Sequence, residues 1–413
     1  MIDNGKGYSR REFVTASLAC LATAGLATVT PSLAGAQDEP KSLAQKSKPV
    51  GGNGVIYRKL GRTGIEVPIV SMGAGACNDP SLVQACYEAG MRLFDTSDTY
   101  AFGRNEQMIG AVLNQLKARD KAIIVTKTLG GPQRDATPPD KMKAAIDQSL
   151  EGSLKRLKTD YVDVLQLYDV RGPEAVRNQA IIDALAAVRK EGKVRFIGLS
   201  THADMANVIN AAVEAGVFDV IQTSFNFTMA SDAPMMNAVA NAGSKGIGII
   251  AMKVLAGGAR YPNPDTLRQY PGAVITSAAL KWVLRNEYVN TSIPGIANFD
   301  HLRANFTVAS NLTLTDEESR FLSDNRITLG MEFCRQCSKC LASCPKKADI
   351  PDLMRVHMYA AQYGDFQLAR QTINGIPREN GLQACTSCAN CTARCANSVN
   401  IPRKIDELKL IYC

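Results

Sequence analysis

The chain has 413 residues, which exceeds what one small domain needs and fits a barrel of about 250 residues plus a second unit. Its 47 basic and 39 acidic residues leave a mild net charge of +8. The sequence has no basic block interleaved with aromatic residues, which argues against nucleic-acid binding. Three histidines in the whole chain also argue against a histidine-based metal site.

The amino-terminal segment has the pattern of an export signal. Residues 9–14, SRREFV, form a twin-arginine motif, a moderately apolar run follows, and Ala-Gly-Ala at 34–36 provides a small-residue cleavage site. The apolar run is too short and too rich in Ser, Thr and Gly for a stable membrane span. We therefore expect a cleaved twin-arginine signal peptide over 1–36 and a linker over 37–54. An uncleaved amphipathic leader is the alternative.

Short apolar segments that alternate with helical patterns predict a closed barrel over residues 55–325. Parallel strands buried on both faces have such β-branched runs, and helical apolar spacing follows them, for example over 181–190. A hairpin over 57–65 comes first, and we expect the first barrel strand at about 67–72. The number of strands favours an α/β fold, a (β/α)8 TIM barrel, over an open doubly wound sheet. The eight strand candidates lie near residues 67, 91, 122, 161, 194, 219, 247 and 290.

Three polar residues follow successive strand candidates. Asp95 ends the second apolar run, Tyr100 comes five residues later, and Lys127 ends the third. The carboxyl ends of barrel strands meet at one face, where catalysis takes place. An ammonium favours the phenolate of a nearby tyrosine, so we expect Tyr100 to exchange a proton with a carbonyl or alcohol, with Lys127 tuning it and Asp95 anchoring Lys127. A structural Asp95–Lys127 ion pair at the barrel rim is the alternative.

Over residues 55–320 the sequence resembles the aldo-keto reductase family. The motifs FDTSDTY at 94–100 and VTK at 125–127 match three members of that family's catalytic tetrad. Gly103 and Glu106 continue its run Tyr-x-x-Gly-x-x-Glu. The resemblance implies an oxidoreductase that acts on a small carbonyl or alcohol.

The fourth member of the tetrad departs from the family. Tyr168 stands after the fourth strand, where most relatives have a histidine. A phenol can hydrogen-bond a substrate carbonyl as an imidazole does, but it cannot carry a positive charge. The departure makes ordinary carbonyl reduction a weaker expectation than the fold.

The resemblance also implies a nicotinamide cofactor, NAD(P)(H), at the barrel mouth. Members that prefer NADPH typically carry a lysine at Gly295 and an arginine at His301, so NADP preference is unsupported and NADH or no soluble nucleotide stays open. A methionine stands where relatives stack a tyrosine on the ring, and a thioether covers an aromatic face less rigidly. The matching positions are Ser200, Thr201 and Gln222 for the carboxamide, Met252 for the ring, and Gly295 and Asn305 for the adenosine.

Two cysteine motifs dominate the region from 326 to 413. Each has the spacing Cys-x-x-Cys-x-x-Cys-x-x-x-Cys, which holds [4Fe–4S] clusters in two-cluster ferredoxins, the fourth cysteine of each motif binding the other cluster. Zinc and disulfides are the alternatives, but zinc sites rarely need this spacing twice, and cysteines this close would form strained bridges. A helical pattern over about 351–372 separates the motifs, so the region resembles an α-helical ferredoxin module. The predicted cluster ligands are Cys334, Cys337, Cys340, Cys344, Cys385, Cys388, Cys391 and Cys395.

The leader and the cysteines predict the same localisation. Clusters are assembled in the reducing cytosol and the twin-arginine route exports folded cargo, so we expect a periplasmic protein. Clusters joined to a hydride-transfer barrel predict an electron relay to a redox partner protein. A second class stays open, a non-catalytic electron-transfer or partner-binding protein with a degenerate barrel site. Tyr168 and Met252 favour this second class, whereas the intact trio around Tyr100 favours the enzyme.

Overall fold

The computed structural model describes residues 54–257, 269–330 and 332–413. The predicted signal peptide, and the predicted linker except Gly54, lie outside these residues. Within the described residues, no helix is both long and apolar enough to cross a membrane.

Eight parallel strands form the centre of the molecule. Each strand is hydrogen-bonded to the next in chain order, from β3 to β10. Two parallel bridges, Val70 to Ser292 and Gly73 to Gly295, then join the last strand to the first and close the sheet. This arrangement confirms the predicted (β/α)8 barrel. The strands are β3 Met72–Gly73, β4 Leu93–Asp95, β5 Ile123–Thr128, β6 Val162–Val170, β7 Val194–Thr201, β8 Val220–Ser224, β9 Gly248–Met252 and β10 Thr291–Ser292.

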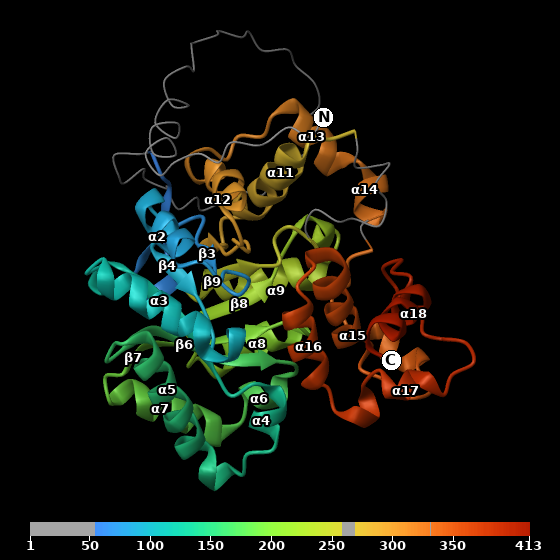
Figure 1. Cartoon of the computed structure of the whole chain (residues 1–413), viewed down its shortest axis with the longest axis horizontal. Coiled ribbons are helices and arrows are strands. Elements are labelled where there is room, and N and C mark those ends of the chain that lie inside the picture. The colour runs from blue at the N-terminus through green and yellow to red at the C-terminus, as the bar shows by residue number, and fades with distance from the viewer. Residues whose placement is uncertain (1–53, 258–268, 331) are drawn as a thin grey trace. The chain divides into compact units, whose positions relative to one another are not determined.

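Helices cover the outside of the strands (Figure 1). Five of them, α2, α7, α9, α12 and α13, begin at an Asp, Asn or Thr whose side chain caps the first turn, as sequence rules favour. In α7, for example, the Asn178 side chain accepts hydrogen bonds from the first turn, and the apolar residues from Ile181 to Val188 are spaced to face the barrel. The barrel helices are α2 Pro80–Ala89, α3 Arg104–Gln115, α4 Gly131–Asp135, α5 Met142–Leu157, α6 Pro173–Val176, α7 Gln179–Lys190, α8 Met205–Ala215, α9 Ala233–Ser244, α11 Gly272–Leu284, α12 Phe299–Phe306, α13 Asp316–Ser323 and α14 Asn325–Gly330.

The predicted hairpin is present, but the prediction that the first barrel strand starts at Val67 is wrong. Strand β1, Tyr57–Lys59, pairs antiparallel with β2, Glu66–Pro68, so that Val67 lies opposite Arg58. The barrel strand begins only after Pro68. One apolar run therefore serves two elements, and burial of Val67 in the barrel core gives it the same pattern as a barrel residue.

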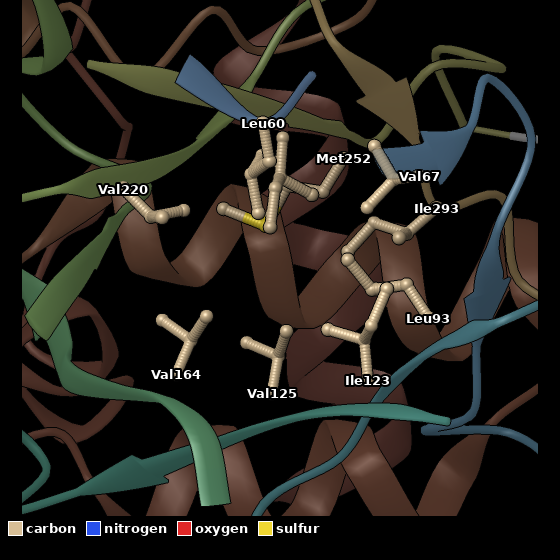
Figure 2. Packing of buried hydrophobic residues seen from close by; sticks show 10 residues of the cluster. Leu60, Val67, Leu93, Ile123, Val125, Val164, Val220, Met252 and Ile293 are labelled. Atoms are coloured by element: carbon tan, nitrogen blue, oxygen red, sulfur yellow. The ribbon is translucent and has the colours of Figure 1, made fainter. Parts of the chain in front are cut away.

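Apolar side chains fill the barrel interior and its amino-terminal end. Figure 2 shows Val125, Val164 and Val220 directed into the interior, with Leu60 of the hairpin close to the same cluster. Arg62, in the hairpin turn, forms an ion pair with Asp219 at 3.1 Å just before β8. We call the apolar side chains at the amino-terminal end, which include Leu60 and Val67, the plug. The carboxyl-terminal end, which we call the barrel mouth, is where barrel enzymes have their active sites.

Residues 332–413, which we call the cluster domain, are mainly helical, as the sequence predicts. The helical segment between the two cysteine motifs is interrupted by a π-helix, an irregularity that often marks functional sites. The elements are α15 Ile350–His357, the π-helix η8 Met358–Tyr363, α16 Phe366–Asn374, α17 Gln383–Thr386 and α18 Ile401–Tyr412. The cluster domain and the barrel belong to one compact unit.

Candidate active site

The structure brings Asp95, Lys127 and Tyr100 together at the barrel mouth. Lys127 Nζ donates to Asp95 Oδ1 at 2.6 Å and to the Thr96 carbonyl oxygen at 2.7 Å. The same nitrogen lies 4.8 Å from the centre of the Tyr100 ring. Asp95 and Lys127 are 3% and 1% exposed, so the pair is buried next to the phenol.

A second layer of contacts holds this trio in place. Glu106 accepts a hydrogen bond from Thr126, the residue before Lys127, at 2.6 Å and pairs with Arg156 at 2.7 Å. Gly103 has φ of 81°, and a Cβ there would stand 2.7 Å from the Arg156 side chain. Gly103 leaves room for the Arg156 side chain, and Glu106 forms an ion pair with it. Both residues of the run Tyr-x-x-Gly-x-x-Glu therefore hold Arg156 in place behind the site.

The Tyr100 phenol is a stronger proton holder than the sequence predicts. Burial, reinforced by the Asp95 charge, raises the pKa of Tyr100 well above its ordinary value. Burial also lowers the pKa of Lys127, while Asp95 opposes that shift. Among the charges that act on the phenol, that of Asp95 is the largest, and it also favours the protonated form. The tuning of Tyr100 by Lys127 stays a prediction. Tyr100 is set up as a proton donor.

Tyr168 lies near the end of β6, so close to Tyr100 that an ionised Tyr168 would raise the pKa of Tyr100. Burial raises the pKa of Tyr168 as well, so two protonated phenols face the barrel mouth. The next residue, Asp169, has a positive φ of 49° and donates its backbone N–H to Ser200 Oγ at 3.1 Å. Its carboxylate contacts His202 Nδ1 at 2.9 Å.

The cluster domain inserts an arginine at this point. Arg355 of α15 forms a two-pronged pair with Asp169, at 2.9 and 3.1 Å. Arg171 pairs with Asp349 at 2.7 Å and with Asp352. Buried Arg–carboxylate forks of this kind fix orientation as well as distance. The cluster domain is therefore held on the barrel mouth.

Sequence reasoning missed the residues of this contact. Arg355 lies 186 residues from Asp169, and only its presence among apolar residues in a buried helix could have singled it out. His202 and Lys253 follow predicted site residues directly in the chain, so their position at strand ends was the available signal. Lys253 Nζ lies 4.5 Å from the Tyr359 ring of the cluster domain.

Most residues predicted for the nucleotide gather at the ends of β7, β8 and β9. Thr201 donates to the Ala203 carbonyl at 3.0 Å, and Gln222 Nε2 contacts Met252 Sδ at 3.7 Å. Gln222 Oε1 is buried without a hydrogen-bond partner among the described residues, which fits a carboxamide N–H as its donor.

The two residues predicted for the adenosine lie elsewhere in the barrel. Gly295 follows β10 and is exposed, and Asn305 is buried in α12. The carboxamide end of a nicotinamide nucleotide thus has a matching acceptor, and its adenosine end has an open approach at Gly295.

The cysteines separate into two crossed quartets. Cys334 lies close to Cys337, Cys340 and Cys395. The fourth cysteine of the second motif therefore joins the first three cysteines of the first motif. Burial raises the pKa of Cys334 to about 12, a penalty that metal binding to the thiolate would offset.

The other quartet has the reciprocal composition. Cys385 lies near Cys388, Cys391 and Cys344. The crossing is the arrangement of two-cluster ferredoxins. Among the described residues, no group of His, Cys, Asp or Glu is close enough to hold a single metal ion. The four cysteines of the first quartet line one hollow, together with residues that include Ile350, Pro351 and Met354.

Comparisons with known proteins agree with this architecture. A model of the aldo/keto reductase family matches residues 80–323, and a model of the 4Fe-4S dicluster domain matches residues 333–400. L-galactose dehydrogenase from Arabidopsis thaliana is 27% identical over 298 residues, covering 65% of this chain and 92% of that protein. An uncharacterized oxidoreductase from Bacillus subtilis is 24% identical over 300 residues, covering 65% of this chain and 95% of the relative.

Solved structures support the same fold. The holo form of an aldo-keto reductase from Bacillus halodurans superposes with a TM-score of 0.54 at 23% identity, covering 64% of this chain and 94% of that one. Because the first family model spans more than half of the chain, the assignment rests on most of the barrel and not on one motif. The chain belongs to the aldo/keto reductase family, is an enzyme of that type, and carries a C-terminal 4Fe-4S dicluster domain.

Proposed function

We propose that this enzyme interconverts a carbonyl and an alcohol by hydride transfer, with Tyr100 as general acid/base, and relays electrons through two [4Fe–4S] clusters. The observation that carries the proposal is the buried Asp95–Lys127 pair next to Tyr100 at the barrel mouth. At the same mouth, Arg355 of the cluster domain pairs with Asp169 of the barrel.

The proton step belongs to the trio. When bound, the nicotinamide supplies or accepts the hydride. During carbonyl reduction the substrate oxygen gains negative charge, the Tyr100 O–H bond breaks, and its proton passes to that oxygen. Lys127, held by Asp95, stabilises the phenolate left behind. Tyr168 offers a second O–H to orient the oxygen. Alcohol oxidation uses the same groups in reverse.

The electron count favours two clusters. Oxidation of an alcohol to a carbonyl releases two electrons and two protons, and each cluster accepts one electron at a time. A redox partner protein would remove those electrons. The twin-arginine leader supports a periplasmic location, where a tightly held nucleotide would act as a relay.

The test uses anaerobically purified protein. We expect iron and sulfide for two clusters, a bound nicotinamide nucleotide, and bleaching of the broad absorption near 400 nm (roughly the range for cubane centres) when an oxidisable alcohol is added. Tyr100→Phe should keep both clusters but lose substrate-driven bleaching, because only the hydroxyl that exchanges the proton with the substrate is removed. Bleaching at the wild-type rate in this variant, or cluster-free protein with full turnover, would overturn the proposal. Dithionite-reducible clusters with no response to any alcohol or carbonyl would instead favour the non-catalytic class.

A further inference from the structure

The first cysteine quartet adjoins the barrel mouth. Cys334 lines one hollow together with His202 and Lys253, which come directly after β7 and β9. Gln336, between the first two cysteines of the first motif, accepts a hydrogen bond from the backbone N–H of Asp204 at 3.2 Å through its carbonyl oxygen. A cluster held by this quartet would therefore lie next to the end of the barrel that carries the chemistry.

One asparagine donates hydrogen bonds to two sulfurs of this quartet. The side-chain Nδ2 of Asn397 donates to Cys337 Sγ at 3.7 Å, and its backbone N–H donates to Cys395 Sγ at 3.3 Å. The two cysteines come from different motifs, so Asn397 bridges the motifs within the quartet. It also lines the hollow that all four cysteines of the quartet line. Hydrogen bonds to the sulfurs help to set the potential of an iron–sulfur cluster, because they stabilise the more negative, reduced form.

A buried lysine places a positive charge beside the same quartet. Lys404 of α18 is 3% exposed and lines the hollow that Cys334 also lines. Glu332 Oε2 lies 3.8 Å from its ammonium, while the closer pair of Glu332, at 2.7 Å, is with Arg403. Burial lowers the pKa of Lys404, and the charges of Glu332 and of an ionised Cys334 oppose that shift. A cation beside the thiolates favours the reduced cluster, which carries one more negative charge than the oxidised cluster.

We propose that Asn397 and Lys404 raise the reduction potential of the cluster held by the first quartet, on the side of the barrel mouth. Reduction adds one electron to this cluster, and the two N–H donors of Asn397 and the ammonium of Lys404 stabilise the added charge. The use of this cluster as the first acceptor of electrons from the barrel mouth rests on the function proposed above, whereas its potential does not.

A redox titration without substrate tests the inference. The anaerobic holoenzyme is reduced stepwise with dithionite in the presence of redox mediators, and EPR spectra of frozen samples follow the two clusters. We expect Lys404→Met to make the one-electron reduction of one cluster about tenfold less favourable, a fall of about 59 mV in its potential. Asn397→Ala should make reduction of the same cluster about threefold less favourable, a fall of about 28 mV. Lys404→Arg keeps the charge and should keep the wild-type potential.

A lysine beside the other quartet distinguishes the two clusters. Lys409 lies close to Cys385 of the second quartet, is partly exposed and pairs with Asp406 at 3.4 Å. Lys409→Met should therefore lower the potential of the other cluster, and by less than Lys404→Met lowers the first. The matched control for Asn397→Ala is Asn374→Ala, at an exposed position at the end of α16, which should leave both potentials unchanged.

The outcomes separate this inference from the proposed function. Iron and sulfide analysis shows whether a variant keeps both clusters, and where one is lost, Lys404→Gln or the isosteric Asn397→Asp takes its place with a fall in the same direction. With both clusters intact, an unchanged potential in the Lys404 or Asn397 variant would overturn the role of that residue. A shift of the same cluster by Lys404→Met and Lys409→Met would overturn the assignment to the first quartet. Tyr100→Phe should leave both potentials unchanged, so a failure of the proton-transfer role does not affect this measurement.

Discussion

The two ends of the barrel are closed by different chemistry. The amino-terminal end is plugged by apolar side chains such as Leu60 and Val67. The barrel mouth is covered by a network of buried charges, in which Asp169 meets Arg355 and His202. Apolar side chains need no hydrogen-bond or ionic partner. Buried charges must be paired, and removing one partner of a buried pair is costly. The difference indicates that the plug maintains the fold, while the mouth keeps polar groups dry for chemistry.

The largest effect on stability should come from breaking the charged cover. Arg355→Met leaves Asp169 buried with less compensation, and we expect a loss of about 3–5 kcal/mol in the free energy of unfolding. Anaerobic denaturant titration measures it. Arg303→Met, which removes an exposed i,i+3 pair with Asp300, is the matched control and should cost less than about 1 kcal/mol. Equal losses in the two variants would mean that the mouth is not held by this pair.

Truncation of the plug should destabilise the enzyme without changing its chemistry. Leu60→Ala removes a fully buried side chain, and we expect a loss of about 3 kcal/mol with kcat unchanged at temperatures where the variant stays folded. Leu410→Ala, at a position that is 88% exposed in α18, is the control and should leave the unfolding free energy unchanged. A kcat that falls in step with stability would contradict the separation of the two ends.

At the mouth, the opposite variant should change chemistry and spare stability. Tyr100→Phe removes only the phenolic hydroxyl, and we expect turnover to fall at least about 100-fold. Because the pKa of Tyr100 is raised well above its usual value, the phenol stays protonated, and carbonyl reduction should show no loss from its ionisation between about pH 6 and 9. Tyr288→Phe, at a ring that packs against Gly243, should keep full activity. A wild-type reduction rate that falls between pH 7 and 9, with no such fall in a Lys127 variant, would mean that Lys127 lowers the pKa of Tyr100 and that the phenol ionises in this range.

The features that the sequence predicts are those carried by local patterns. Strand periodicity, the polar residues Asp95, Tyr100 and Lys127 at strand ends, and the cysteine spacing all lie within short windows. The Val67 boundary was misassigned because a hairpin strand that packs into the barrel core has the same apolar pattern as a barrel strand. The direction of the Tyr100 pKa and the partner of Asp169 depend on burial and on a contact across 186 residues, which no local window contains.

His202 offers the smallest and most specific test of the charged cover. Burial and the Arg355 charge lower its pKa to about 3, so the folded state binds its proton less readily than the unfolded state, in which a histidine titrates near 6.5. Its contribution to stability is therefore complete above about pH 6.5 and is lost as the pH falls toward 3. Between pH 7 and 5 the linkage amounts to about 2 kcal/mol. In His202→Asn the decline in unfolding free energy over that range should shrink by this amount, whereas His301→Asn, at an exposed position, should leave it unchanged. An unaltered decline in His202→Asn would mean that the acid sensitivity of the mouth resides in Asp169 and its arginines instead.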